Sequence, residues 1–267
     1  MAVGRCAAVV LSLGLLIFPA EGASAQSGSA TQTEGRVSAQ DQALVGTIWS
    51  AREGRAVSRE ELLEGLSSTP LILLGEVHDN PEHHSLRAWI IGELATRRSA
   101  SGERGPAVVF EHIRADQQSL VDDFLASDER ADAGALLQKL DWDRSGWPSA
   151  AMFSPLFEQA LKFRLPIFAG NTPAEAIRKV AREGLASLLD EERSRLGLDQ
   201  QLEPHLYAAL IKDIEENHCG LVPESAFPPM ALAQQYRDAH LAERMISAMA
   251  ANGAAVLLAG NGHVRSD

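Results

Sequence analysis

The sequence predicts an α/β fold in which a mostly parallel sheet is flanked by helices and carries an additional helical insert. Four apolar runs predict the strands, at residues 71–74, 107–110, 165–169 and 254–259. The runs lack polar alternation, which is typical of strands buried on both faces in parallel sheets covered by helices. Helical patterns lie between the runs, as expected where helices join parallel strands.

The first 25 residues predict a signal peptide. Arg5 is followed by an apolar run over residues 7–18, and Ala23-Ser24-Ala25 offers a small-residue cleavage site before Gln26. The run is short for a bilayer span, and a retained membrane anchor is the alternative. Cys6 stands before the run, whereas lipidation requires a cysteine at its end. We therefore expect a protein that is periplasmic or secreted after cleavage of the signal peptide.

The formal net charge is −12 at pH 7. One Arg and one Glu cancel within residues 1–25, so the whole negative charge remains on the rest of the chain. Nucleic acids and anionic membrane surfaces are bound by basic patches. The composition therefore argues against nucleic acid as a partner.

Residues 26–44 are small and polar and predict a flexible tether. Residues 45–267 then fit one domain, which begins with a lead-in and one amphipathic helix up to about Leu66. After the first strand, Asn80-Pro81 predicts the cap and first position of a helix, with Leu86, Ile90 and Leu94 on its apolar face.

The second strand is followed by a predicted helix over residues 117–125, with Leu120, Val121 and Phe124 on one face. Ser154-Pro155 and Thr172-Pro173 predict two further helix starts, and the second helix should stop at Gly184. Residues 185–228 predict the helical insert. A long helix from about Pro229 should end at Asn252-Gly253, before the last strand.

Polar residues follow all four predicted strands. They are Gly75-Glu76-Val77-His78, Glu111-His112, Gly170-Asn171-Thr172 and Gly260-Asn261-Gly262-His263. The carboxyl ends of parallel strands share one edge of the sheet, where open α/β proteins place their sites. We therefore expect these side chains to converge.

Imidazole and carboxylate are good ligands for zinc or manganese, and a Glu beside a His can act as a general base on water. The expected metal or catalytic set is Glu76, His78, Glu111 and His263. Asn171 and Asn261 either join this site or cap the helices that follow, and His112 is expected only beside the site. Asp238 could orient a strand-end histidine, although an ordinary solvated helix face explains it equally well.

No serine nucleophile elbow, phosphate loop or dinucleotide fingerprint occurs in the sequence. The spacing of the histidines also differs from the HExxH zinc helix. These patterns leave two classes of function open, a ligand-binding protein and a metal-dependent hydrolase.

Several ordered motifs resemble the ChaN-like family. They are LGEVHDNPEHH at residues 74–84, Glu111 after the second strand, GNTP at 170–173, QxxRDA at 234–239 and AGNGHVR at 259–265. The family consists of exported bacterial proteins implicated in haem binding and iron uptake, in a superfamily with the TIKI/TraB proteins and erythromycin esterases. The resemblance implies metal binding or hydrolysis at the two Gly-x-x-His motifs, and further residues after Asp267.

The resemblance implies that haem is the cofactor and that the role lies in haem or iron uptake, and outer-membrane uptake machinery is a conceivable partner. Because no CxxCH motif is present, any haem is expected to be noncovalent. Tyr207, Tyr236, His83 and His84 are candidate ligands, and His218 and Cys219 are further ones. Haem can also be sandwiched between protomers, so a homodimer is conceivable. The alternative is a divalent metal such as zinc or manganese in a hydrolase that uses the two Glu and two His.

Overall fold

The computed structural model describes residues 45–127 and 132–265. The chain divides into two compact units, Met1–Arg59 and Glu60–Asp267. The described part of the first unit is an antiparallel hairpin of β1 (Ile48–Ser50) and β2 (Arg55–Val57), which the sequence did not predict. The expected signal peptide and tether lie outside the described residues.

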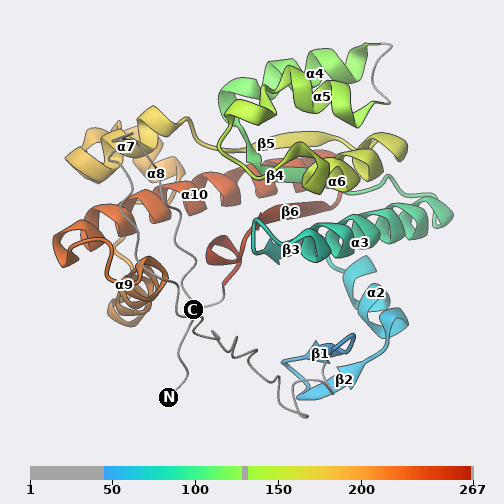
Figure 1. Ribbon diagram of the computed structural model, residues 1–267, viewed down its shortest axis with the longest axis horizontal. Helices are drawn as coiled ribbons and strands as arrows, with labels where there is room; N and C mark the ends of the chain where they lie inside the picture. The colour runs from blue at the N-terminus through green and yellow to red at the C-terminus, as the bar shows by residue number, and fades with distance from the viewer. Residues whose placement is uncertain (1–44, 128–131, 266–267) are drawn as a thin grey trace, which may run out of the picture. The chain divides into compact units, whose positions relative to one another are not determined.

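The second unit is built on a four-stranded parallel sheet of order β3-β6-β4-β5 (Figure 1). Its strands correspond to the four apolar runs and are β3 (Leu71–Glu76), β4 (Ala107–Arg114), β5 (Ile167–Asn171) and β6 (Ala255–Gly260). The predicted α/β fold with a parallel sheet and an additional helical insert is therefore confirmed.

Both faces of the sheet are covered by helices, which explains why the strands lack polar alternation. On one face, the alternate residues Ile72, Val108 and Val256 belong to a large core that includes side chains of four helices. These helices are α3 (Pro81–Ala100), α4 (Gln118–Ala126), α5 (Ala133–Lys139) and α6 (Ala150–Lys162). On the other face, Val109 and Leu257 pack against α10 (Phe227–Asn252).

The starts and ends of most helices agree with the sequence. The side-chain Oδ1 of Asn80 accepts a hydrogen bond of 3.0 Å from the backbone N–H of Glu82, and α3 begins at Pro81. The helix α7 (Ala174–Glu183) ends at Gly184 and α10 ends before Gly253, both with positive φ. Glycine is favoured at caps with positive φ because it has no Cβ.

Two helix predictions were wrong. The helix expected to start at Ser154-Pro155 begins at Ala150, so Pro155 lies inside α6. The fully buried Phe153 and Leu156 anchor that helix and offset the hydrogen bond that a proline removes. The apolar face expected for α3 was also displaced, because Leu86 is exposed.

The helical insert contains α8 (Asp190–Arg195) and α9 (Pro204–His218), together with short 3-10 turns at η3 (Leu185–Ser187) and η4 (Glu224–Ala226). Its apolar side chains pack against the first half of α10 in two small clusters, which include Tyr236 and Ala231. Further 3-10 turns are η1 (Ala115–Gln117), η2 (Trp142–Arg144) and η5 (Asn261–His263), and α2 (Arg59–Ser67) is the helix predicted before β3.

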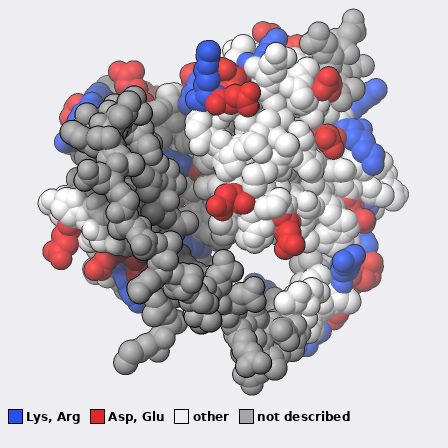
Figure 2. All heavy atoms as spheres, in the orientation of Figure 1, with Lys and Arg blue, Asp and Glu red and all other residues white. Residues whose placement is uncertain are grey.

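No helix among the described residues is long and apolar enough to cross a membrane. On the face of the molecule shown in Figure 2, Lys and Arg side chains lie among Asp and Glu side chains. That face therefore presents mixed charge, with a broad area of other residues between the charged groups.

Candidate functional site

The carboxyl edge of the sheet holds two polar clusters, one on each side. Glu76 follows Ile72 by four residues on β3, and Glu111 follows Val109 by two residues on β4, so each pair lies on the same face of its strand. Successive side chains of a strand point to opposite faces. Ile72 faces the core with α3 and α6, whereas Val109 faces α10. The expected convergence at one edge is therefore present, but the two carboxylates have different surroundings.

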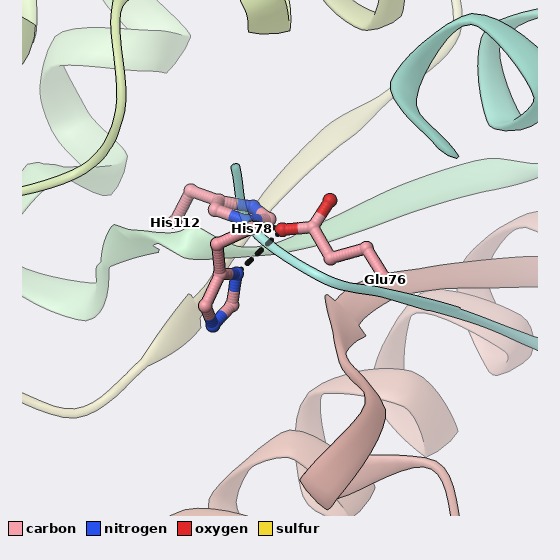
Figure 3. A group of neighbouring side chains, drawn as sticks. All are labelled: Glu76, His78 and His112. Carbon is pink, nitrogen blue, oxygen red and sulfur yellow. Dashed lines mark hydrogen bonds and ion pairs between the residues drawn. The ribbon is translucent and has the colours of Figure 1, made fainter. Parts of the chain in front are cut away.

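The first cluster, called the Glu76 cluster below, consists of Glu76, His78, His84, Arg87 and His112. The Glu76 carboxylate is buried, and its Oε1 lies 2.6 Å from Nδ1 of His78 and 2.7 Å from Nε2 of His112 (Figure 3). The buried guanidinium of Arg87 forms an ion pair with Oε2. A carboxylate this deeply buried requires such partners, because an unpaired charge there would be costly.

The tautomers in the Glu76 cluster follow from its hydrogen bonds. His84 donates from Nε2 to the carbonyl of His78 at 2.9 Å and accepts at Nδ1 from Arg87 at 2.9 Å. Burial lowers the pKa of His84 and of His112, so both rings are neutral at pH 7. His112 donates from Nε2 to Glu76, and its buried Nδ1 has no partner among the described residues.

His78 is the member of this cluster that is open to solvent, with 39% of its side chain exposed. Its Nδ1–H faces Glu76, which leaves the Nε2 lone pair for a proton or a ligand. Burial lowers the pKa of His78, although Glu111 acts in the opposite direction. Trp147 stands against the rings of both His78 and His112, at centroid distances of 4.8 and 4.7 Å.

The second cluster, called the Glu111 cluster, consists of Glu111, Arg237, Asp238 and His263. Arg237 of α10 forms an ion pair with Oε1 of Glu111, and Nε2 of His263 lies 3.3 Å from the same oxygen. The backbone N–H of Gly260 donates to Oε2 at 2.7 Å. Burial opposes ionisation of Glu111, but His263 and Arg237 outweigh it and hold the pKa of that carboxyl well below its usual range.

His263 bridges Glu111 and Asp238. Its Nδ1 is hydrogen-bonded to Asp238, the carboxylate that the sequence left equally open to an ordinary surface role. Burial disfavours the charged ring, but the hydrogen bonds to Asp238 and Glu111 outweigh this and raise the pKa of His263 to about 8. The carboxylate pair therefore holds His263 largely protonated at neutral pH.

Gly260 separates the two clusters. A Cβ at this position would lie 2.9 Å from Nε2 of His78 and 3.7 Å from Oε2 of Glu111. The absence of a side chain therefore lets the imidazole edge of His78 approach the backbone of β6. This close approach explains why a glycine is needed at the first position of the second Gly-x-x-His motif.

The other candidate residues are not members of these two clusters. Asn171 accepts from the backbone N–H of Thr172 at 2.9 Å, a local cap, and Asn261 is exposed in η5. Tyr236 is buried and donates to Glu192 at 3.0 Å, which together raise the pKa of Tyr236 to about 12. His83 accepts at Nδ1 from the backbone N–H of Val77 at 2.9 Å.

Tyr207 is the expected residue that borders a large cavity. This cavity, called the Tyr207 cavity, has a volume of about 520 Å³ and includes Leu185, Leu198, Leu202 and Leu232 in its lining. Tyr207 lies on α9 and is 37% exposed. His218 and Cys219 lie at the other end of α9, as its last residue and its C-cap.

Three functional candidates were missed or underrated from sequence. Arg87 and Arg237 neutralise the two carboxylates, and His112 belongs with Glu76 and His78 to a group whose ligand atoms lie within 4.8 Å of one another. The sequence could have indicated that Arg87 is buried, because it lies three residues after His84 and four residues before Ile91 on one face of α3.

Comparison with known proteins agrees with this architecture. A family model described as haem-binding uptake, Tiki superfamily, ChaN, matches residues 62–267. The chain belongs to this family. No curated protein matches the sequence of this chain.

Two solved structures are similar to the chain. One is described as cofacial haem binding to ChaN of Campylobacter jejuni and has 19% sequence identity to this chain and a TM-score of 0.62. The match covers 80% of this chain and 78% of that structure's chain. The other is the type III effector HopBA1, with 14% identity and a TM-score of 0.40, covering 76% and 71% of the two chains. The first match supports the fold of this ChaN-family protein.

Proposed function

We propose that this ChaN-family protein binds haem noncovalently, as an exported component of haem or iron uptake, with Tyr207 as the ligand of the iron. Family membership supports haem as the ligand. The observation that carries the choice of Tyr207 is its position at the Tyr207 cavity, where leucines offer an apolar surface to a porphyrin. Tyrosine is an established ligand of haem iron in proteins.

The other expected ligands are engaged elsewhere. The side chain of His84 is fully buried with both ring nitrogens bonded, and Tyr236 is 3% exposed with its hydroxyl bound to Glu192. His83 accepts at Nδ1, so its Nε2 carries the proton in the neutral ring. Binding of iron at His83 would therefore require a change of tautomer and the loss of the bond to Val77.

The test is a haemin titration of the mature protein, residues 26–267, followed by the Soret band. We expect a stoichiometric, shifted band that is lost or strongly altered in Tyr207→Phe and retained in the matched control Tyr236→Phe. Absence of a shifted band in the wild-type protein would contradict haem binding. A band that persists in Tyr207→Phe and is lost in His218→Ala or His83→Ala would place the ligand at that histidine.

Export, a haem-bridged dimer and contact with outer-membrane uptake machinery are parts of the same proposal. Tyr207 is 37% exposed, so a haem bound to it would remain open on one side and could be covered by a second copy. Analytical ultracentrifugation with and without haemin tests the dimer, which should form only with haemin. Detection of the chain beginning at Gln26 in a periplasmic fraction tests cleavage and export.

A second candidate function is binding of a divalent ion by Glu76, His78 and His112, whose ligand atoms lie within 4.8 Å of one another. This donor set suits zinc, which would supply a Lewis acid for hydrolysis. Ligand atoms of tetrahedral zinc are about 3.3 Å apart, whereas the present contacts to Glu76 are 2.6 and 2.7 Å. Each imidazole would therefore have to move away from the Glu76 carboxylate by about 0.6–0.7 Å and lose the proton that bridges them.

Arg87 competes with such an ion because it already forms an ion pair with Glu76. Equilibrium dialysis with zinc or manganese, followed by elemental analysis, tests this candidate. We expect about one equivalent in the wild type and in the exposed control His205→Ala, and none in His78→Ala. Equal metal content in all three proteins would contradict an ion at this cluster.

A further inference from the structure

A second cavity adjoins the Glu111 cluster on the side of the helical insert. This cavity, called the His263 cavity, has a volume of about 300 Å³ and is bounded by α9, α10, η5 and residues that follow α8. Its polar members include His263 and Asp238, so it begins where the Glu111 cluster ends. It shares Leu198, Gln200, Leu202 and Gln235 with the Tyr207 cavity but does not include Tyr207.

Part of the lining of the His263 cavity is apolar. Leu206 and Leu210 are four residues apart on α9 and therefore share a helix face, and Leu198 and Leu202 precede that helix. Four leucines from two segments thus line the same space. Such a wall favours an aliphatic or other apolar group, because its burial removes apolar surface from water.

The lining of the cavity also has polar members, and their charges are paired. Arg265 forms an ion pair with Asp213 from α9, and His263 is hydrogen-bonded to Asp238 from α10. Gln235 adds an uncharged amide to the lining. A carboxylate or ammonium ligand would have to compete with these pairs, whereas an uncharged group could use their remaining donor and acceptor capacity.

We propose that the His263 cavity binds a small uncharged amphiphile, with a hydroxyl, ester or amide head beside His263 and an aliphatic chain along the leucines. At about 30 Å³ for a water-sized group, the cavity volume accommodates roughly ten non-hydrogen atoms. The head would then lie next to the Glu111 cluster. The site borders the Tyr207 cavity and shares part of its lining, but it does not include Tyr207, and the proposal does not depend on haem binding there.

The test uses straight-chain primary alcohols from butanol to decanol, added to the mature protein and followed by chemical shifts in two-dimensional amide NMR. We expect saturable binding that tightens about fourfold for each added CH₂ until the cavity is full. The carboxylate and the amine of equal chain length should bind at least roughly tenfold more weakly, because each brings a charge without a free counter-charge. Tighter binding of either charged series would contradict an uncharged head.

Two variants fill the cavity, Leu206→Trp and Leu210→Phe, and Leu221→Trp is the matched control because Leu221 is 79% exposed and lies outside the lining. We expect either filling variant to abolish alcohol binding and the control to retain it, with folding of each checked by circular dichroism. Binding that all three variants lose equally, or that does not depend on chain length, overturns the site. Displacement of octanol by one equivalent of haemin would also overturn it, since the cavity would then be part of the haem site.

Discussion

Removal of the His263 side chain should abolish a pH-dependent part of the protein's stability. Burial disfavours the imidazolium, but hydrogen bonds to Asp238 and Glu111 outweigh this and raise the pKa of His263 to about 8. A histidine in the unfolded chain has a pKa of about 6.5. Because the folded value is the higher one, the stabilisation is fully present below pH 6.5 and is lost as the pH rises through 8.

The pKa of His263 rises from about 6.5 in the unfolded chain to about 8 in the folded protein. At about 1.36 kcal/mol per pKa unit, protonation of His263 adds about 2 kcal/mol to the free energy of unfolding at mildly acidic pH, and this contribution is lost at alkaline pH. Roughly 1 kcal/mol of this should be lost between pH 7 and pH 9. The histidines with lowered pKa act in the opposite direction, because their folded forms resist protonation. These are His78, His84, His112 and His240, and they reduce stability chiefly as the pH falls through 6.5. The interval from pH 7 to pH 9 therefore separates the contribution of His263 from those of these four histidines.

Urea unfolding of the wild type, His263→Gln and the exposed control His205→Gln at pH 7, 8 and 9 measures this contribution. The free energy of unfolding should fall by roughly 1 kcal/mol across the interval in the wild type and in the control. In His263→Gln the fall should be absent. An equal pH dependence in wild type and His263→Gln would refute the assignment, as would a wild-type protein that gains stability towards pH 9.

Three further changes probe the same edge of the sheet. Arg87→Met removes the guanidinium that neutralises the buried Glu76 carboxylate and should lower the free energy of unfolding in urea by about 3–5 kcal/mol. Gly260→Ala places a Cβ 2.8 Å from Cε1 of His78 and should abolish zinc binding in dialysis without changing the haemin Soret band. Gly262→Ala is the control, because its Cβ meets nothing closer than 3.8 Å, and it should retain zinc binding. Asn80→Ala removes the cap of α3 and should lower the melting temperature, corresponding to about 1 kcal/mol; an unchanged melting temperature would contradict that role.

The strands were predictable from the sequence because a strand that is buried on both faces consists of a continuous run of apolar residues. The continuous apolar runs at 71–74, 107–110, 165–169 and 254–259 all became strands of one sheet. The start of α6 was not predictable from Ser154-Pro155, because tertiary packing of the fully buried Phe153 overrides the local preference of proline. Local turn and cap rules work only where packing does not oppose them.

The members of the site were more predictable than their arrangement. Glu76, His78, Glu111 and His263 do gather at the carboxyl edge, as the positions after the strands indicated. Their division into two clusters was also encoded, because strand parity places Glu76 with Ile72 and Glu111 with Val109. The sequence pattern does not reveal which distant groups neutralise each carboxylate, since Arg87 and Arg237 come from helices whose packing depends on the whole core.

Haem and a divalent ion would occupy different parts of this protein, so the two candidate functions do not exclude one another. The Nε2 edge of His78 faces Gly260 of β6, and Trp147 stands against the ring. A planar porphyrin needs an open apolar surface around its axial ligand, which the Tyr207 cavity offers and this narrow edge does not. A single ion needs only converging donor atoms. Loss of zinc without loss of haem in His78→Ala, and the reverse in Tyr207→Phe, is therefore the pattern expected if both sites operate.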